Sequence, residues 1–85
     1  MTDVFTDKTL LITGGTGTFG NAVLRHSLGI PFREFRVFSR DEKKQDEMRR
    51  AFPDPRVKFY IGDVRDPNSL NDAASGVDFI FHAAA

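Results

Sequence analysis

A glycine-rich segment directly after an apolar run constrains this chain more than any other feature of its sequence. Residues 9–13 have the length and apolar character of a buried strand. The segment Gly14-Gly-Thr-Gly-Thr-Phe-Gly20 follows without a gap, and from Phe19 onward apolar residues recur at helical spacing. The sequence therefore predicts a strand, a tight turn and a helix in immediate succession.

The turn between this strand and helix is suited to binding a phosphate group. Glycine has no Cβ, so it adopts positive φ readily and lets a ligand approach the backbone, while free N–H groups at a helix start attract an anion. Gly14 and Gly15 can make the turn, Gly17 can face a pyrophosphate, and Gly20 can let the helix pack tightly on the strand. The residues that we expect to contact the ligand are Gly14, Gly17, Thr18, Phe19 and Gly20.

A glycine-rich segment has two other common uses. It can be a plain connection without a ligand, which the flanking strand and helix make the less favoured interpretation. It can also be a P-loop, which we exclude because Asn21 follows Gly20 and no Gly-Lys-Ser/Thr sequence is present. A ligand-binding turn is therefore the main interpretation, and the plain connection remains its alternative.

Strand-like and helix-like segments alternate along the rest of the chain. We expect strands at residues 9–13, 34–38, 57–61 and 77–81, and helices at residues 18–28, 41–51 and 67–74. Gly29 is placed to end the first helix in a left-handed conformation, whereas Asp66 and Pro67 start the third helix and Gly76 ends it. This alternation predicts one α/β domain with a parallel sheet in the doubly wound strand order 3-2-1-4.

The composition excludes several classes of protein. Lys plus Arg equal Asp plus Glu at 12 each, so the overall charge does not indicate a nucleic-acid partner. The absence of cysteine excludes a disulfide framework, a thiolate zinc site and a cysteine nucleophile. No window approaches the ~18–20 apolar residues of a membrane span, and residues 1–8 do not resemble a signal peptide. We therefore expect a cytoplasmic protein with no membrane span.

The end of the second predicted strand carries the residues expected to meet the adenosine ribose of a dinucleotide, about 20 residues after the glycine turn. A carboxylate there would bind a 2′-hydroxyl and repel a 2′-phosphate, whereas Ser39 and Arg40 suit phosphate oxygens. This favours NADP over NAD. Asp41 leaves NAD open, because it could neutralise Arg40 or reach a ribose hydroxyl. Lys43 and Lys44 could add positive charge or form an ordinary charged helix surface.

The segment Gly62-Asp-Val-Arg-Asp66 after the third strand supplies candidate contacts for the adenine. The carboxylate of Asp63 can accept the exocyclic amine, and Val64 can lie against the ring. The alternative for Asp63 is a turn or capping role, which aspartates after strands often have. We expect Arg65 to pair with Asp63 or Asp66 rather than with the ligand.

Small residues follow the fourth strand. Ala83 and Ala84 leave room for a dinucleotide to pass over the strand ends. His82, which closes the strand, is assigned a structural role. No nucleophile is indicated, because Ser75 and Asp78 lie on a turn without a nucleophile-elbow pattern.

Three motifs together resemble those of a known family. They are Thr13-Gly-Gly-Thr-Gly-Thr-Phe-Gly20, Gly62-Asp-Val-Arg-Asp66 and Phe81-His-Ala-Ala-Ala85, in this order and spacing. In these motifs the chain resembles the extended short-chain dehydrogenase/reductases that act on nucleotide sugars. The stretch Phe38-Ser-Arg-Asp-Glu-Lys-Lys-Gln45 makes it most similar to the bacterial UDP-N-acetylglucosamine 4,6-dehydratases of capsule and surface-polysaccharide synthesis.

The resemblance implies that residues 1–85 are the N-terminal part of an NAD(P)-binding Rossmann domain, truncated after its fourth strand. It implies a larger, homo-oligomeric enzyme that uses NADP as a recycled cofactor and takes a UDP-sugar as substrate. In that reaction C4 of the sugar is oxidised, C5 loses a proton, water leaves from C6 and the hydride returns. The family's catalytic Tyr-x-x-x-Lys set has no match here, since Val64 stands four residues after Tyr60. We therefore assign no catalytic residue and expect the chain alone to be inactive.

Other functions remain open. A UDP-sugar 4-epimerase shares these motifs but usually carries an acidic NAD signature where this chain has Ser39. A stand-alone, non-catalytic dinucleotide-binding module and a structural remnant without a ligand are alternatives from other classes. We also expect the isolated chain to self-associate through its fourth strand, for which the sequence supplies neither a covering helix nor a further partner strand.

Overall fold

Four parallel strands form the centre of the structure, a computed structural model in which residues 4–83 are described. The elements in chain order are β1 (Thr9–Thr13), α1 (Thr18–Ser27), β2 (Glu34–Ser39), α2 (Glu42–Ala51), β3 (Val57–Ile61), α3 (Pro67–Ala74) and β4 (Phe79–His82). The strands pair in the order β3-β2-β1-β4, all parallel. The predicted α/β class, parallel sheet and strand order are confirmed.

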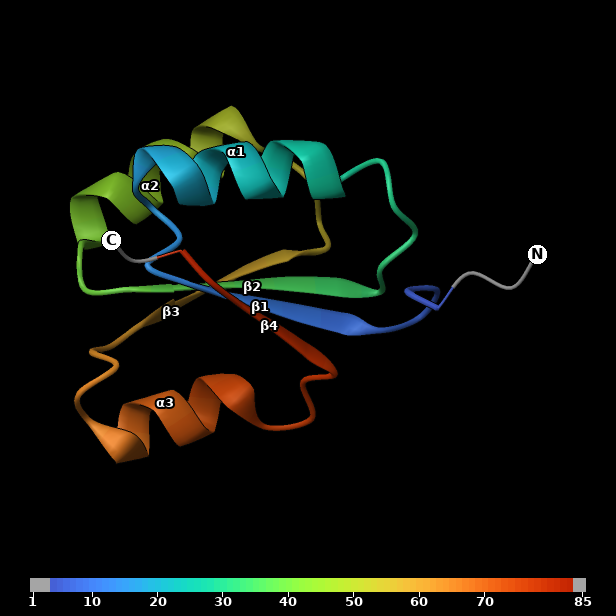
Figure 1. The fold of residues 1–85 in the computed structure, drawn as a ribbon. Helices are drawn as coiled ribbons and strands as arrows, with labels where there is room; N and C mark the ends of the chain where they lie inside the picture. The colour runs from blue at the N-terminus through green and yellow to red at the C-terminus, as the bar shows by residue number, and fades with distance from the viewer. Residues whose placement is uncertain (1–3, 84–85) are drawn as a thin grey trace.

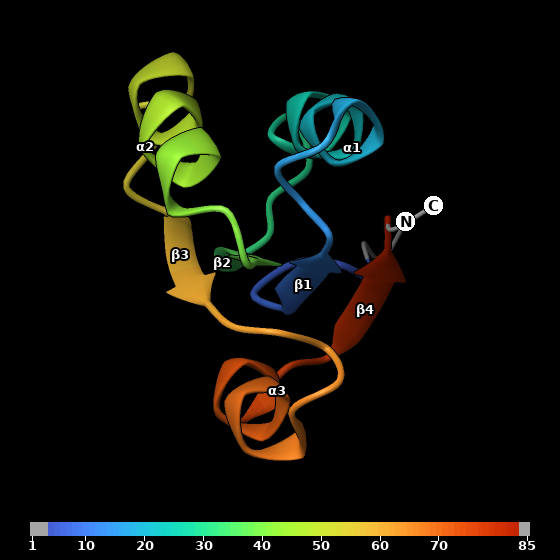
Figure 2. The same ribbon diagram turned by 90° about the vertical axis from the view of Figure 1, so that its left-hand side faces the viewer.

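Helices cover both faces of the sheet (Figure 1). Helices α1 and α2 lie on one face and α3 lies on the other (Figure 2). The strands at the centre of such a sheet are buried on both sides, so they read as unbroken apolar runs rather than as alternating patterns. Strand β1 fits this description, because all five of its residues are buried. Among residues 4–83, no helix is long and apolar enough to cross a membrane.

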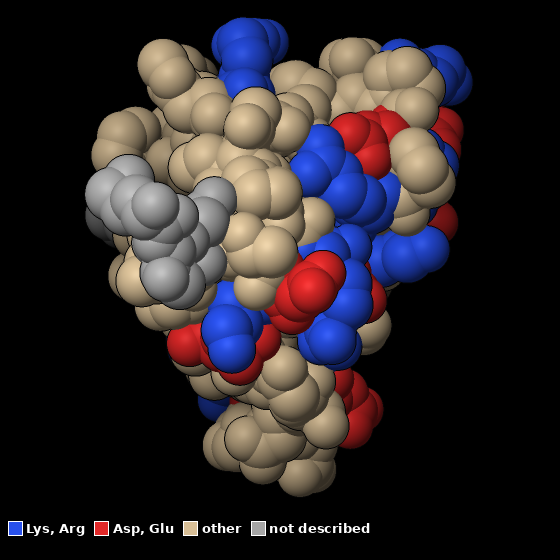
Figure 3. Space-filling model, turned by 90° about the vertical axis from the view of Figure 1, so that its right-hand side faces the viewer, with Lys and Arg blue, Asp and Glu red and all other residues tan. Residues whose placement is uncertain are grey.

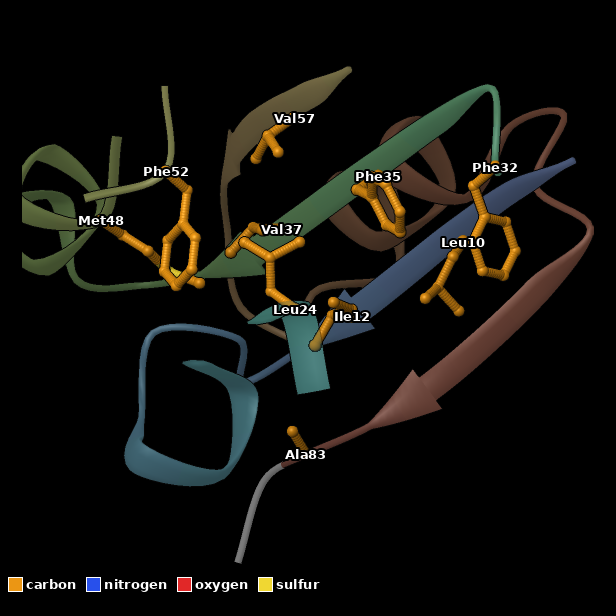
Figure 4. Close-up of a cluster of buried hydrophobic side chains, with 10 residues drawn as sticks. All are labelled: Leu10, Ile12, Leu24, Phe32, Phe35, Val37, Met48, Phe52, Val57 and Ala83. Carbon is orange, nitrogen blue, oxygen red and sulfur yellow. The ribbon is translucent and has the colours of Figure 1, made fainter. Parts of the chain in front are cut away.

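The core has two parts, one on each face of the sheet. Figure 4 shows the larger part, which lies beneath α1 and α2 and draws on three strands as well as both helices. Its buried residues are Leu10, Ile12, Leu24, Phe32, Phe35, Val37, Met48, Phe52, Val57 and Ala83. The smaller part consists of Leu11, Phe38 and Ala73, with Tyr60 and Leu70 packed against them beneath α3. Successive residues of β1 therefore serve opposite layers of the core.

The predicted bounds of α1, β2, α2 and β4 differ from the structure by one or two residues, and β2 extends to Ser39 while α2 begins at Glu42. Helix α1 ends at Ser27, and Leu28 caps it in the right-handed helical region at φ −63°. The left-handed conformation predicted for Gly29 is wrong, because Gly14 and Gly76 are the only glycines with positive φ among the described residues. Gly76, at φ 74°, follows the end of α3 as predicted.

Strand β4 begins at Phe79 rather than at Val77. The N–H of Val77 still donates to the carbonyl of Ala74 at the end of α3, over 3.1 Å. Asp78 is held at the start of β1, because its carboxylate accepts the N–H of Thr9 over 2.9 Å and its own N–H donates to the Thr9 carbonyl over 3.0 Å. These contacts fix residues 77 and 78 as the connection between α3 and the sheet.

The two edges of the sheet differ in charge. Edge strand β3 contains Lys58 and follows Arg56, whereas edge strand β4 reads Phe-Ile-Phe-His and has no Lys, Arg, Asp or Glu. All four residues of β4 are exposed, and Ile80 is 60% exposed. Charged side chains, lysine above all, discourage an edge strand from pairing with another chain. The structure therefore leaves β4 as the less protected edge.

We predict that the chain self-associates through β4 and that Ile80→Lys weakens this association. The new charge would lie on the exposed edge and oppose strand pairing. Sedimentation velocity over a range of concentrations measures the effect. Ile61→Lys, at an equally apolar and 54% exposed position on β3, is the matched control and should leave association unchanged. A monodisperse wild-type monomer at high concentration would contradict this prediction.

Candidate dinucleotide-binding site

The amino ends of the strands carry a mixed and paired set of charges. Figure 3 shows this side of the molecule, where Lys and Arg side chains are interspersed with Asp and Glu. Two close ion pairs lie here, between Arg36 and Glu34 and between Arg56 and Asp54. The glycine turn and the carboxyl ends of the strands lie at the opposite end of the sheet, which faces the viewer in Figure 2, and this end is the candidate site.

The glycine turn lies at the carboxyl end of β1. Gly14 adopts φ 65°, a conformation that residues with a Cβ rarely take, and the N–H of Gly15 donates to the carbonyl of Phe38 on β2. A Cβ on Gly20 would lie 2.5 Å from the Cα of Gly15, so α1 touches the backbone of the turn itself. The predicted close packing at Gly20 is therefore present, but Gly20 packs against the backbone of the turn and not against the strand. A Cβ on Gly17 would meet only the Gly14 carbonyl, at 3.7 Å.

The start of α1 is built differently from the other two helix starts. Asp41 and Asp66 cap α2 and α3, and their carboxylates accept backbone N–H groups over 2.9 and 3.1 Å. Gly17 caps α1 without any side-chain hydrogen bond. Because the first N–H groups of a helix have no partner within the helix, those of α1 are available to an anion. This arrangement agrees with the phosphate contact expected for the turn.

Asn21 holds the turn in place, a role that the sequence analysis missed. Its side-chain amide donates to the carbonyls of Thr16, over 3.2 Å, and Gly17, over 2.9 Å. Both acceptors lie in the turn just before α1. An asparagine in the first turn of a helix, within reach of the preceding backbone, was the only sequence signal for this contact.

The ends of three strands surround a hollow of about 350 Å³ beside the turn. Its lining residues are Gly14, Phe38, Ser39, Arg40, Gly62, Asp63, Val64 and Arg65. A second hollow, of about 630 Å³, adjoins it and is lined by Thr16, Gly17, Ser39, Arg40, Asp41, Glu42 and Lys44. Ser39 and Arg40 line both hollows. The structure thus brings the glycine turn, the β2 end and the β3 end together, as the sequence predicts.

Asp63 is held as a carboxylate by two arginines. The side chain and the backbone N–H of Arg65 donate to it, over 2.8 and 2.9 Å, which confirms the predicted pairing. Arg40 lies farther away, with its Nη1 atom 3.6 Å from Oδ2 of Asp63. Hydrogen bonds from Arg65, with a smaller effect of the Arg40 charge, lower the pKa of Asp63 to about 2. Asp63 is therefore an acceptor at neutral pH, as an adenine amine requires.

Arg40 keeps most of its side chain in solvent, with 70% exposed. Its neighbour Asp41 does not pair with it, because the Asp41 carboxylate accepts the N–H of Lys44 and caps α2. The sequence allows Asp41 either to neutralise Arg40 or to reach a ribose hydroxyl, and the structure does not show the first of these roles. Arg40 keeps its 3.6 Å contact with Asp63, and its exposed guanidinium can also meet an anion in either hollow.

The two lysines of α2 lie in different places. Lys44 lines the hollow beside Arg40 and the glycine turn. Lys43 instead lines a separate hollow along β3 with Phe59 and Ile61. The structure therefore brings Lys44, and not Lys43, together with Ser39 and Arg40.

The remaining predicted site residues are spread around the turn. Thr18 lines a groove between α1 and α2, and Val64, 41% exposed, lines the hollow beside Asp63. Phe19 lies farther out, with its ring 5.6 Å from that of Phe81, and lines an apolar groove between α1 and β4.

Ala83 is buried and its N–H donates to the Thr13 carbonyl, whereas Ala84 lies outside the described residues.

His82 joins the edge strand β4 to its neighbour β1. Its Nδ1 atom is hydrogen-bonded to the hydroxyl of Thr13, at the carboxyl ends of β4 and β1. This contact agrees with the structural role predicted for His82.

The fold and the position of the glycine turn define a partial NAD(P)-binding Rossmann fold. WbmG from Bordetella bronchiseptica, solved in complex with NAD, superimposes with a TM-score of 0.77 at 24% identity, covering 100% of this chain and 27% of that one. A short-chain dehydrogenase/reductase from Veillonella parvula, solved with NADP, gives 0.73 at 19% identity, covering 88% and 34%. Pen from Bacillus thuringiensis gives a TM-score of 0.90 at 39% identity, covering 96% and 25%.

The sequence model of the polysaccharide biosynthesis protein family matches residues 10–85, and the chain belongs to this family. Proteins named UDP-glucose 4-epimerase, from Rickettsia bellii and Rickettsia conorii, are each 60% identical to it over 86 residues. Each alignment covers 96% of this chain and 25% of the relative. The chain thus spans about a quarter of the length of these relatives.

We predict that Gly20→Ala destabilises the chain by ~1–3 kcal/mol, because the added Cβ would displace the backbone of Gly15. Chemical denaturation measures the change. Gly29→Ala is the control, since a Cβ there meets nothing within 4 Å. It should leave stability unchanged or raise it by up to about 1 kcal/mol. Equal effects of the two substitutions would show that α1 does not depend on close contact with the turn.

We predict that Arg65→Ala raises the pKa of Asp63 from about 2 toward its usual value of 3.8. Because folding lowers this pKa, the Asp63 contribution to stability is complete above pH 3.8 and is lost as the pH falls through about 2. In the variant the folded and unfolded pKa values become nearly equal, so this pH-dependent contribution to stability largely disappears. NMR titration of the Asp63 carboxyl carbon measures the pKa, and Arg49→Ala, which removes an exposed partner of Asp46, is the control. An unchanged pKa of Asp63 in the Arg65 variant would disprove that Arg65 lowers it.

Proposed function

We propose that this chain forms the dinucleotide-binding part of an enzyme that oxidises C4 of a UDP-sugar, with NADP as its cofactor. The observation that carries the proposal is that Ser39 and Arg40 line both hollows. Gly17 of the glycine turn lines the hollow of about 630 Å³, and Asp63 lines the hollow of about 350 Å³. The two regions expected to bind phosphate and adenine are therefore continuous.

The residues present fit such a cofactor in three places. The uncapped start of α1 offers N–H groups to a pyrophosphate. Asp63 offers a carboxylate to an adenine amine, and Val64 offers an apolar surface to the ring. Arg40 and Lys44 offer positive charge to a phosphate in the adjoining hollow. When bound, the nicotinamide of such a cofactor accepts a hydride from the sugar and returns it.

The preference for NADP rests on the end of β2. Ser39 stands where a carboxylate would reject a 2′-phosphate, and the nearby carboxylate of Asp41 is engaged as a helix cap. Arg40 is exposed and lies in both hollows. A guanidinium suits phosphate oxygens in geometry as well as in charge.

A UDP-sugar 4-epimerase is our main proposal for the reaction. The relatives at 60% identity are named UDP-glucose 4-epimerase, and the family match to polysaccharide biosynthesis proteins agrees with a sugar substrate. In an epimerase, the hydride removed from C4 returns to the opposite face of the sugar ring. This proposal replaces the dehydratase interpretation as the first choice.

A UDP-N-acetylglucosamine 4,6-dehydratase is the second candidate. It is favoured by Ser39 and Arg40, which occupy the position where epimerases usually carry an acidic residue, and by the resemblance of residues 38–45. Both reactions begin with oxidation at C4, so the same nucleotide site serves either. Incubation of the full-length protein with UDP-glucose and with UDP-N-acetylglucosamine separates them, because epimerisation conserves the mass of the sugar and dehydration removes one water. Tight nucleotide binding without either product would instead support a non-catalytic module.

The nucleotide preference is tested by titration with NADPH and NADH. We expect tighter binding of NADPH, weakened by salt, and a 10- to 100-fold loss of NADPH affinity in Arg40→Ala with little change for NADH. Calorimetry or nicotinamide fluorescence measures both affinities. Arg50→Ala is the matched control, because Arg50 is equally exposed, at 73%, and lines neither hollow.

Two outcomes would overturn parts of this proposal. An Arg40 variant that loses affinity equally for both nucleotides would overturn the assignment of Arg40 to a 2′-phosphate. Failure of the full-length protein to bind either nucleotide would overturn the dinucleotide site as a whole.

A further inference from the structure

Gln45 is a polar side chain buried against the site. It lies on α2 and is only 2% exposed, and the other buried residue of this helix is the apolar Met48. Its Nε2 atom lies 2.8 Å from the carbonyl oxygen of Tyr60, 3.1 Å from the hydroxyl oxygen of Ser39 and 3.3 Å from the Ser39 carbonyl oxygen. Gln45 thus connects the ends of β2 and β3 from the helix between them.

The chemistry of these partners fixes which end of the Gln45 amide faces the strands. The carbonyl oxygens of Tyr60 and Ser39 can only accept hydrogen bonds, so the NH₂ group must point toward them. This group has two hydrogens. One serves the close Tyr60 carbonyl, and the other is shared between the two oxygens of Ser39.

The hydroxyl of Ser39 consequently receives two hydrogen bonds. Gln45 donates to it over 3.1 Å, and the N–H of Asp41 donates to it over 3.3 Å. A hydroxyl has two lone pairs and one hydrogen, so both lone pairs are engaged and the O–H remains for another partner. Ser39 lines both hollows, where it can therefore offer a donor and no acceptor.

We propose that Gln45 is a positioning residue that fixes the Ser39 hydroxyl as a hydrogen-bond donor toward the site and thereby favours a phosphate over a ribose hydroxyl. A 2′-phosphate brings only acceptors at neutral pH and matches this donor and the guanidinium of Arg40. A 2′-hydroxyl would find no acceptor for its own hydrogen at Ser39. The inference rests on the proposed dinucleotide function and adds to it the residue that sets nucleotide specificity.

The test measures the ratio of NADPH to NADH affinity in three variants of the full-length protein. Gln45→Met keeps the length of the side chain and removes its donors, and we expect the ratio to fall about tenfold with NADH affinity nearly unchanged. Ser39→Ala should lower the ratio by a similar factor. The double variant should lower it no further, because Gln45 acts through the Ser39 hydroxyl.

A purely structural role for Gln45 gives a different pattern. It would reduce the affinities for both nucleotides equally, and its effect would add to that of Ser39→Ala. Either result would overturn the inference. Ser39→Ala keeps Gln45 and its bond to the Tyr60 carbonyl, so an unchanged ratio in this variant would also overturn it, whether or not Gln45→Met folds.

These outcomes are distinct from failure of the proposed function. If the wild-type protein binds neither nucleotide, the dinucleotide site itself is wrong. If it prefers NADPH through Arg40 but its preference is insensitive to Ser39→Ala and Gln45→Met, only the roles of the Ser39 hydroxyl and Gln45 are wrong.

Discussion

The close contact between α1 and the turn before it is the constraint on which the rest of the structure depends. Because Gly20 has no side chain, the helix can begin against the backbone of Gly15, directly beyond the end of β1. Gly17, the residue that caps the helix, then lines the same hollow as Ser39 and Arg40 at the end of β2. A bulkier residue at position 20 would move the helix start away and separate the parts of both hollows.

Most of the fold could be predicted from local sequence, because apolar runs mark the strands and turn-forming residues mark their ends. The predicted bounds of β1, β3 and α3 agree with the structure. One error arose where a contact distant in sequence decides the outcome, and another where a local signal was misleading. Residues 77 and 78 lie before the fourth strand rather than in it, because Asp78 forms hydrogen bonds with Thr9. The local sequence does not indicate these bonds. Leu28 ends α1 without a left-handed residue, so Gly29 was a misleading signal.

The candidate site was predictable to the extent that sheet topology determines it. The carboxyl ends of parallel strands lie at the same end of the sheet, which brings Ser39, Arg40 and Asp63 together. Helical rotation was harder to anticipate: successive residues differ by about 100° around the axis, so Lys44 faces the turn and Lys43 faces β3. The contacts of Gln45 could not be predicted, because they depend on a backbone carbonyl of another strand.

The uncapped start of α1 has a consequence for the lifetime of the protein. The other two helices carry their own side-chain caps, whereas no side chain caps α1, so the N–H groups of its first turn are left to solvent or to a bound anion. A ligand that binds only the folded chain stabilises it, by about 2.7 kcal/mol at a hundredfold excess over its Kd. If that ligand is the nucleotide proposed above, its supply would determine how much of the protein escapes unfolding and proteolysis.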